Sequence, residues 1–140
     1  MVIQRNRSSA GPALRSAKFR IPLLFNGPPV GTPSRLSMTY RIVVGSFTDD
    51  VYTLDFDPSS KSLNVVAKTT LGTKPSWIAQ HPNDPTLVFA ALEQTDGKII
   101  AVKFDKEDGK GRVVGEVSCG GADPCSVLAT EDELIAANVS

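Results

Sequence analysis

The sequence has very few of the residues on which disulfide frameworks and metal sites depend. Its 140 residues include only two cysteines, Cys119 and Cys125, and one histidine, His81. Two cysteines cannot form a framework of several bridges, and their spacing is not the close paired spacing of a zinc site. We therefore predict no metal site, and we interpret both cysteines as reduced, buried thiols.

Long apolar runs, phosphate-binding loops and a charge excess are also missing. No run approaches the roughly 20 apolar residues of a membrane span, and no glycine-rich loop joins a strand to a helix. Lysine plus arginine and aspartate plus glutamate both number 15, so charge does not favour a nucleic-acid partner. The sequence thus predicts no cofactor, no nucleic-acid partner, no membrane partner and a cytoplasmic location.

Acidic residues are absent before Asp49, whereas six basic residues precede Arg41. Residues 1–37 are rich in Ser, Arg, Pro and Gly, and their prolines prevent a long helix. We predict that they form a disordered basic leader, with initiation at Met38 as one possibility. The alternative is a mitochondrial presequence, because such segments are rich in arginine and serine and poor in acids. The location would then be mitochondrial.

The rest of the chain repeats itself. The segment Val51–Asp57 recurs as Ile99–Asp105, and a constant offset of 48 residues also relates Gly72 to Gly120. A second pair of segments, Lys74–Ala79 and Asp123–Leu128, is offset by 49 residues. Self-similarity at roughly 40 to 50 residues, with about four short strands in each copy, is typical of β-propeller blades. The sequence therefore predicts an all-β fold.

The strands of this propeller are predicted from short apolar segments between turns rich in Asp, Gly, Pro and Ser. A first blade has its second to fourth strands at 40–46, 51–57 and 63–71, and it lacks an innermost strand, which closed propellers commonly take from the other chain end. A full second blade follows at 77–80, 87–92, 98–104 and 112–119, and a third begins at 125–129 and 134–138. Since propellers close with roughly four to eight blades, residues 38–140 predict an incomplete ring of two to three blades of four antiparallel strands.

Four segments together resemble the lactonase family, which has a seven-bladed β-propeller fold: Val44–Thr48, Val51–Asp57, Pro75–Pro82 and Gly120–Cys125. This family includes 6-phosphogluconolactonase and the fungal carboxy-cis,cis-muconate lactonizing enzyme. The resemblance covers residues 38–140 and implies action on a small lactone or hydroxy acid, which would be the partner. Many relatives carry a histidine directly after the Pro-Cys pair, whereas this chain has Ser126.

The resemblance also limits what these residues can do. The family's catalytic histidine, glutamate and arginine are expected mostly in later blades, so this chain is expected to be a truncated form without the full catalytic set, and its catalytic residues are unknown. The alternative is a non-catalytic propeller that binds or scaffolds, since the fold alone does not imply chemistry. The oligomeric state is not predicted.

Candidate binding residues come from the loops that enter first strands and leave second strands, because these loops converge on the central channel of a propeller. Ser76, Glu93 and Asn138 are predicted to bind substrate there, since a carboxylate and a carboxamide can bind hydroxyl or carboxylate groups. Alternatively, they are solvated or tie neighbouring blades together. The same mouth is expected to include Lys74, Gln94, Asp123 and Ser126.

Two aromatic side chains have other predicted roles. His81 has an ordinary pKa near neutrality, but it lies between a first and a second strand, on the face opposite this mouth. We therefore predict a turn residue and not a general base. Trp77 is predicted to pack between blades or to line the channel, with a partner for its indole N–H.

Overall fold

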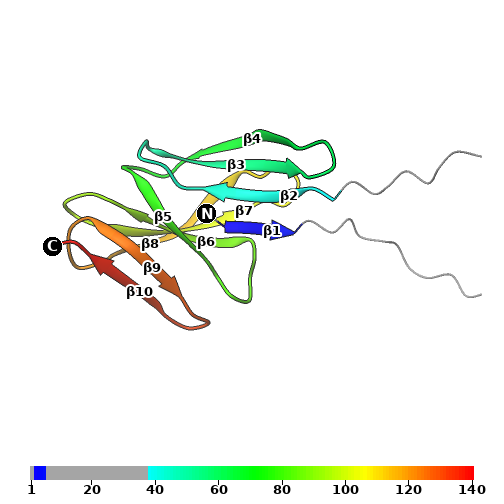
Figure 1. The fold of residues 1–140 in the computed structure, drawn as a ribbon. Helices are drawn as coiled ribbons and strands as arrows, with labels where there is room; N and C mark the ends of the chain where they lie inside the picture. The colour runs from blue at the N-terminus through cyan, green and yellow to red at the C-terminus, as the bar shows by residue number, and fades with distance from the viewer. Residues whose placement is uncertain (1, 6–37) are drawn as a thin grey trace, which may run out of the picture.

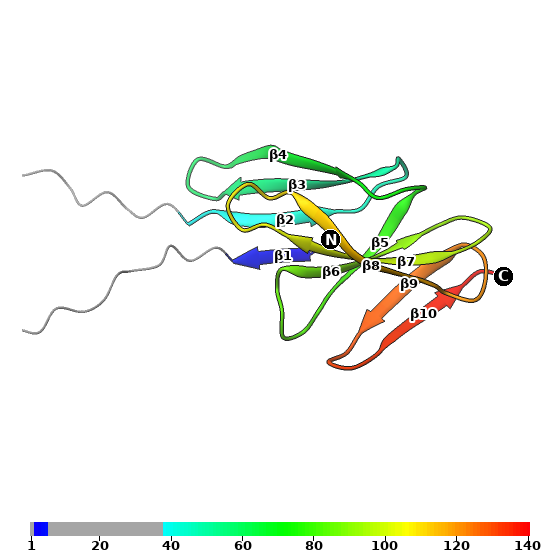
Figure 2. The ribbon, with the colours of Figure 1, turned by 180° about the vertical axis from the view of Figure 1, so that it is seen from behind.

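The computed structural model describes residues 2–5, by their backbone alone, and residues 38–140. The described residues form ten antiparallel β-strands and no helix, in three sheets that fan out from one another (Figures 1 and 2). The first blade has the strand order β1-β2-β3-β4, the second β5-β6-β7-β8, and the third is the pair β9-β10. The strands are β1 (Val2–Arg5), β2 (Tyr40–Val44), β3 (Asp50–Asp57), β4 (Ser62–Thr70), β5 (Pro75–Gln80), β6 (Leu87–Leu92), β7 (Lys98–Phe104), β8 (Gly111–Ser118), β9 (Pro124–Ala129) and β10 (Leu134–Asn138). This is the all-β, incomplete propeller that the repeat predicts.

The first blade is more complete than predicted. Strand β1 pairs antiparallel with β2, from Val2 opposite Val43 to Arg5 opposite Tyr40. The prediction that this blade lacks its innermost strand is therefore wrong. The hydrogen-bonding edge of β2 attracts an extended segment, and the start of the chain supplies it. Residue 1 and residues 6–37 lie outside the described residues, and the disordered leader over residues 1–37 stays a prediction.

The inner part of the second blade is buried on both faces because this blade lies between the other two, whereas its outer strand β8 is exposed. Strand β6 shows this most clearly, since five of its six residues, Val88–Leu92, are buried. Apolar side chains on both faces are typical of a strand covered on two sides, and they explain why this segment reads as a continuous apolar run. One face meets the first blade and the other meets the third, so β6 belongs to two cores.

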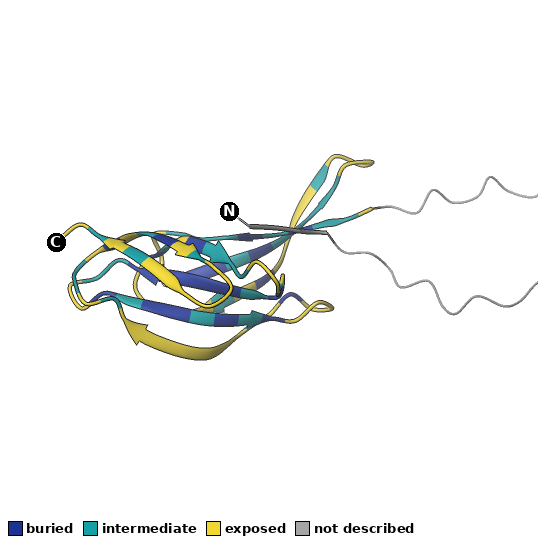
Figure 3. Ribbon diagram, turned by 90° about the horizontal axis from the view of Figure 1, so that it is seen from below, coloured by how far each residue is buried: buried dark blue, intermediate teal, exposed yellow. Residues whose placement is uncertain are grey.

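Two apolar clusters hold the blades together. The cluster between the first and second blades contains Val43, Val51, Ile78, Val88, Ala90, Leu92, Ile100, Val102 and Phe104. The cluster between the second and third blades is smaller and contains Phe89, Ala91, Ile99 and Val127, with alanines around them. Figure 3 shows the buried positions along the interior strands, with exposed residues on outer strands and loops. Apolar burial of this kind supplies most of the free energy of folding.

The repeat extends to irregularities in strand pairing. Between β3 and β4 the register shifts so that Val66 is left unpaired, and between β7 and β8 the same shift leaves Val114 unpaired. A second pair of shifts leaves out Ser76 in β5 and Cys125 in β9, each directly after a proline. β-bulges of this kind re-aim side chains and often lie next to functional sites. The bulge at Ser76 is where the candidate site begins.

Candidate functional site at the channel mouth

Ser76 and Glu93 are brought together at the predicted mouth. The Ser76 hydroxyl donates a hydrogen bond to Oε1 of Glu93. The backbone reinforces this pairing, because the Lys74 carbonyl accepts hydrogen bonds from the Ser76 N–H (2.7 Å) and from the Glu93 N–H (3.2 Å). Both side chains are half-buried. The result is a carboxylate and a hydroxyl held in fixed relative positions and still open to solvent.

The residues directly before Pro75 and Pro124 share an unusual backbone conformation, which therefore repeats between blades. Lys74 has φ of 48° and Asp123 has φ of 49°. Positive φ values are uncommon for residues other than glycine and are often found at functional sites. In both blades this conformation turns the chain into the first strand, and in the second blade it directs the Lys74 carbonyl toward the Ser76 and Glu93 amides.

Asn138 is not joined to this pair. Its Nδ2 donates to the Cys119 carbonyl (3.1 Å), and its Oδ1 is buried without a hydrogen-bond partner among the described residues. The amide packs so tightly on Gly121 that a Cβ there would lie 2.5 Å from Nδ2. Asn138 therefore ties β10 to the loop before β9, and its predicted role in binding stays a prediction.

The other residues predicted at the mouth lie around the second and third blades. The Asp123 N–H donates to the Gln94 carbonyl (2.9 Å), which links the loop after β6 to the start of β9. Ser126 is half-buried in β9. Cys125 is exposed, so the prediction of a buried thiol is wrong for this residue, whereas Cys119 is half-buried. Cys125 lies at the bulge of β9, and bulges of this kind re-aim side chains.

The contacts of His81 and Trp77 place one side chain in a turn and the other between blades. His81 lies in the turn between β5 and β6, where its Nδ1 accepts a hydrogen bond from the Asn83 N–H (3.2 Å). Trp77 is 45% exposed, and its indole N–H donates to the Val127 carbonyl of the third blade (3.0 Å). Trp77 thus bridges two blades next to the mouth.

The loop between β2 and β3 is a part of the mouth that the sequence reasoning missed. The Ser46 N–H donates to the Pro75 carbonyl (3.1 Å), directly before Ser76. A Cβ on Gly45 would lie 2.5 Å from the Pro75 carbonyl oxygen and 2.9 Å from that of Ser76. Only glycine allows this close approach of two backbones. The glycine in the segment Val44–Thr48 is the signal from which this contact could have been inferred.

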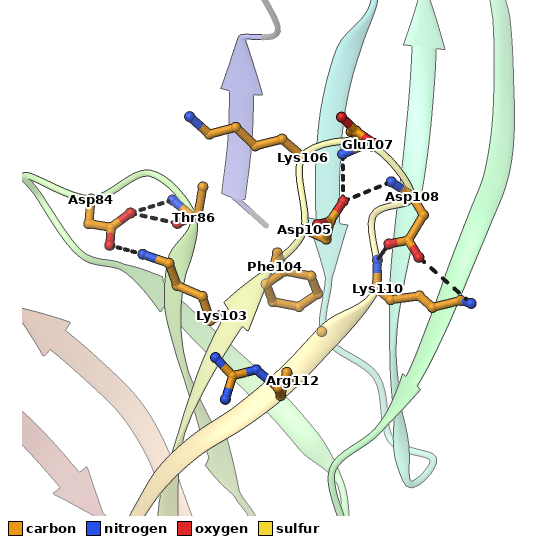
Figure 4. Close-up of a pocket in the computed structure, with 11 residues that line it drawn as sticks. Asp84, Thr86, Lys103, Phe104, Asp105, Lys106, Glu107, Asp108, Lys110 and Arg112 are labelled. Carbon is orange, nitrogen blue, oxygen red and sulfur yellow. Dashed lines mark hydrogen bonds and ion pairs between the residues drawn. The ribbon is translucent and has the colours of Figure 1, made fainter.

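A charged groove of about 780 Å³ lies at the opposite end of the second blade (Figure 4). Asp84, Thr86 and Lys103 line one side, and the turn from Asp105 to Lys110 lines the other. The Lys103 ammonium pairs with Asp84, and Thr86 donates to the same carboxylate, so these bonds hold the pKa of Asp84 well below its usual range. The carboxylate is therefore ionised at neutral pH.

The acidic side chains of this groove are largely used in its own turns. Asp105 accepts hydrogen bonds from the backbone N–H groups of Asp108 (3.0 Å) and Glu107 (2.7 Å), which lower its pKa. Asp108 accepts from the Lys110 N–H (2.8 Å). Side chains that cap a turn are not free to bind a ligand. We therefore place the candidate site at the channel mouth and not in this groove.

Arg41 fixes the groove's turn to the first blade. Its Nε and Nη2 bind both carboxylate oxygens of Asp55 (2.7 and 3.0 Å), and its Nη1 donates to the Lys106 carbonyl (3.1 Å). Arg41 is 8% exposed, and the hydrogen bond to Asp55 raises the pKa of Arg41 above its usual value. The guanidinium thus connects β2 and β3 to the hairpin between β7 and β8.

Within residues 38–140, no group of three or more His, Cys, Asp or Glu side chains could hold a metal ion. Over the described residues there is also no helix long and apolar enough to cross a bilayer.

Repeated four-stranded antiparallel blades, with a polar site where first-strand and second-strand loops meet, define a β-propeller protein. The family model described as lactonase, 7-bladed beta-propeller, matches residues 41–139. The chain therefore belongs to this lactonase family, as the motifs indicate.

Individual relatives are similar over a limited part of their length. A 6-phosphogluconolactonase from Formosa agariphila is 30% identical over 91 residues, which are 60% of this chain and 26% of that protein. The solved structure of a candidate 6-phosphogluconolactonase from Bacteroides fragilis matches with a TM-score of 0.67 and 22% identity, over 76% of this chain and 31% of that one. A second such structure, from Bacteroides uniformis, has a TM-score of 0.65 and 24% identity, over 71% and 30% of the two chains. The chain thus spans between a quarter and a third of these relatives, and the structural matches establish the fold alone.

Proposed function

We propose that the chain forms the ligand-binding mouth of a lactonase-type propeller and acts there on a small lactone or on the corresponding hydroxy acid. The observation that carries this proposal is the Ser76–Glu93 pair, fixed by the Lys74 carbonyl in a chain of the lactonase family. The relatives named 6-phosphogluconolactonase support a sugar-acid lactone as the substrate class. A muconate-type lactone is the second substrate to be tested.

The chemistry of the pair suits such a ligand. A carboxylate accepts hydrogen bonds from ligand hydroxyl groups, and such charge-assisted bonds are stronger than neutral ones. Ser76 both donates and accepts, so it can exchange its bond to Glu93 for one to the ligand. Lys74, exposed beside the pair, would attract a phosphate or carboxylate group. The pair and Lys74 are assigned to binding, and no catalytic residue is assigned.

The test is calorimetric titration of the purified 140-residue chain with freshly dissolved glucono-δ-lactone, with acid release followed in parallel. We expect Glu93→Gln to weaken binding by about tenfold or more, because a hydrogen bond to a charged group contributes roughly 1.5–3 kcal/mol. Glu116→Gln is the matched control, since Glu116 is an exposed carboxylate of β8 that pairs with Lys98. It should leave binding unchanged.

Three possible results distinguish an enzyme, a non-catalytic binding propeller and a chain that binds no lactone. Acid release above the spontaneous rate, lost in Glu93→Gln, would support an enzyme. Binding without acid release would support a non-catalytic binding propeller, the alternative function. A wild-type chain that binds neither the gluconic nor the muconate lactone would overturn the proposal.

The location of the protein is a separate proposal. We propose that the protein is located in the cytoplasm. The alternative is a mitochondrial location with residues 1–37 as a presequence, because those residues are basic and contain no acid. Imaging a C-terminal fluorescent fusion, with and without residues 1–37, separates the two. A mitochondrial signal that depends on residues 1–37 would overturn the cytoplasmic location.

A further inference from the structure

The loop between β2 and β3 rests on the backbone that carries Ser76. The Ser46 N–H reaches the Pro75 carbonyl, and Gly45 lies against the carbonyls of Pro75 and Ser76. Phe47 is the next residue along this loop, so it is adjacent in sequence to a residue in direct contact with the site. Phe47 therefore extends from a loop whose backbone contacts the backbone that carries Ser76.

The loop is held in one conformation by its own side chains. The Ser46 Oγ donates to the Asp50 carbonyl (2.6 Å) and accepts from the Thr48 N–H (3.1 Å), and the Thr48 Oγ1 accepts from the Asp50 N–H (3.3 Å). These bonds fix the backbone on both sides of Phe47. A side chain on a loop that is already ordered loses less conformational entropy when it binds a ligand.

Phe47 is unusual in its exposure. It is 74% exposed, the largest value among the exposed large apolar side chains of the described residues. Phenylalanine is usually buried, and the other phenylalanines of residues 38–140 are buried or half-buried. An exposed phenyl ring on a fixed loop that contacts the Ser76 backbone fits a ligand site, because such sites combine aromatic walls with a few placed polar groups.

We propose that Phe47 forms the apolar wall of a ligand site whose polar wall is the Ser76–Glu93 pair. The ligand class is a small cyclic lactone of a polyhydroxy acid, which turns the C–H face of its ring toward Phe47 and a hydroxyl edge toward Glu93. An open-chain hydroxy acid has no rigid ring face, so Phe47 selects the closed ring over the open acid. This inference rests on the proposed function and deepens it.

The experiment compares a ring with an open chain. The δ-lactam of gluconic acid is a ring that does not hydrolyse under the conditions of the assay, and sodium gluconate is the open acid. Calorimetric titration of the full 140-residue chain measures the Kd of each for the wild type, Phe47→Ala, Phe47→Leu and Glu93→Gln. Leu63→Ala is the matched control, because Leu63 is an exposed apolar side chain (57%) on the outermost strand β4. Circular dichroism and thermal melting check that each variant folds.

We expect Phe47→Ala to raise the Kd for the lactam roughly three- to tenfold, in line with the strength of aromatic contacts. The Kd for gluconate should change by less than about twofold, Phe47→Leu should lie between, and Leu63→Ala should change neither. If Phe47→Ala binds the lactam as the wild type does, or weakens both ligands equally, the Phe47 inference is overturned while lactone binding stands. If the wild type binds neither ligand, both the inference and the proposed function are overturned.

Discussion

Arg41 shows how a single side chain can join two blades. A guanidinium that makes two parallel bonds to a carboxylate and also reaches a backbone carbonyl uses the geometry that lysine lacks. At 8% exposure the charge is nearly removed from water, so its partners decide whether it stabilises the fold. Asp55 and the Lys106 carbonyl are those partners.

We predict that Arg41→Met lowers the free energy of unfolding by about 3 kcal/mol, because removing one partner of a buried pair leaves the other unpaired. Lys98→Met is the control, since the Lys98–Glu116 pair is exposed and should contribute less than about 1 kcal/mol. Urea denaturation of both variants measures the difference. Equal effects of the two substitutions would show that Arg41 does not hold the blades together.

Asp84 provides a pH-dependent test at the same scale. Because Lys103 and Thr86 lower its pKa in the folded chain, its contribution to stability is present above the ordinary aspartate pKa. That contribution is lost as the pH falls below about 3.9 toward the lowered value in the folded state. The stability difference between the wild type and Asp84→Asn, from urea denaturation, should be constant from about pH 7 to 5 and should shrink in stronger acid. A difference that stays constant into strong acid would contradict this.

At the scale of strands and loops, the sequence predicts most elements well. The strands β2 to β10 fall within a few residues of the predicted segments, because the apolar repeat and the turn residues both mark them. Strand β1 was missed because Val2–Arg5 has no counterpart in the repeat and lies far from β2 in sequence. Bulges were missed too, although the paired valines Val65-Val66 and Val113-Val114 mark two of them.

The loop between β2 and β3 gives the element-scale prediction. Gly45→Ala should destabilise the fold by roughly 1–3 kcal/mol, because the added Cβ would overlap two backbone carbonyls that cannot easily move. It should also weaken lactone binding, since the loop that carries Phe47 would be displaced. Thermal melting and titration measure the two effects.

Gly115 is the matched control for this substitution. A Cβ on Gly115 would meet only the Ala101 Cβ, at 3.9 Å. Gly115→Ala should therefore be neutral or stabilise the strand by about 0.5 kcal/mol. If the two alanine variants behave alike, the close contact between the β2–β3 loop and β5 is not important for the fold.

At the scale of the whole molecule, the blades differ in how fully they are covered. The second blade lies between two neighbours, whereas exposed apolar side chains remain on the outer strands and on the third blade, including Val65 (63%), Leu128 (59%) and Ile135 (54%). Large exposed apolar faces favour association with other surfaces. Because the second blade is covered by a neighbour on each side, we expect it to be the most stable part of the described chain.

The candidate site could be predicted from the sequence only in part. Ser76 and Glu93 were placed at one mouth because the propeller topology brings first-strand and second-strand loops together, and the structure adds the hydrogen bond between them. The tie of Asn138 to Cys119 depends on side-chain packing that periodicity does not encode. The approach of Gly45 to Pro75 depends on contact between blades, which a repeat within one chain does not reveal.

The measurement that tests the account most directly is a two-dimensional NMR titration of the isotope-labelled 140-residue chain with the δ-lactam of gluconic acid. We predict that the amide shifts that move belong to Ser46–Thr48, Lys74–Trp77 and Glu93–Thr95, at the channel mouth. The amides of the opposite groove, from Asp84 to Thr86 and from Asp105 to Lys110, should stay in place. Shifts confined to that groove, or no shifts at millimolar ligand, would contradict a lactone site at the mouth.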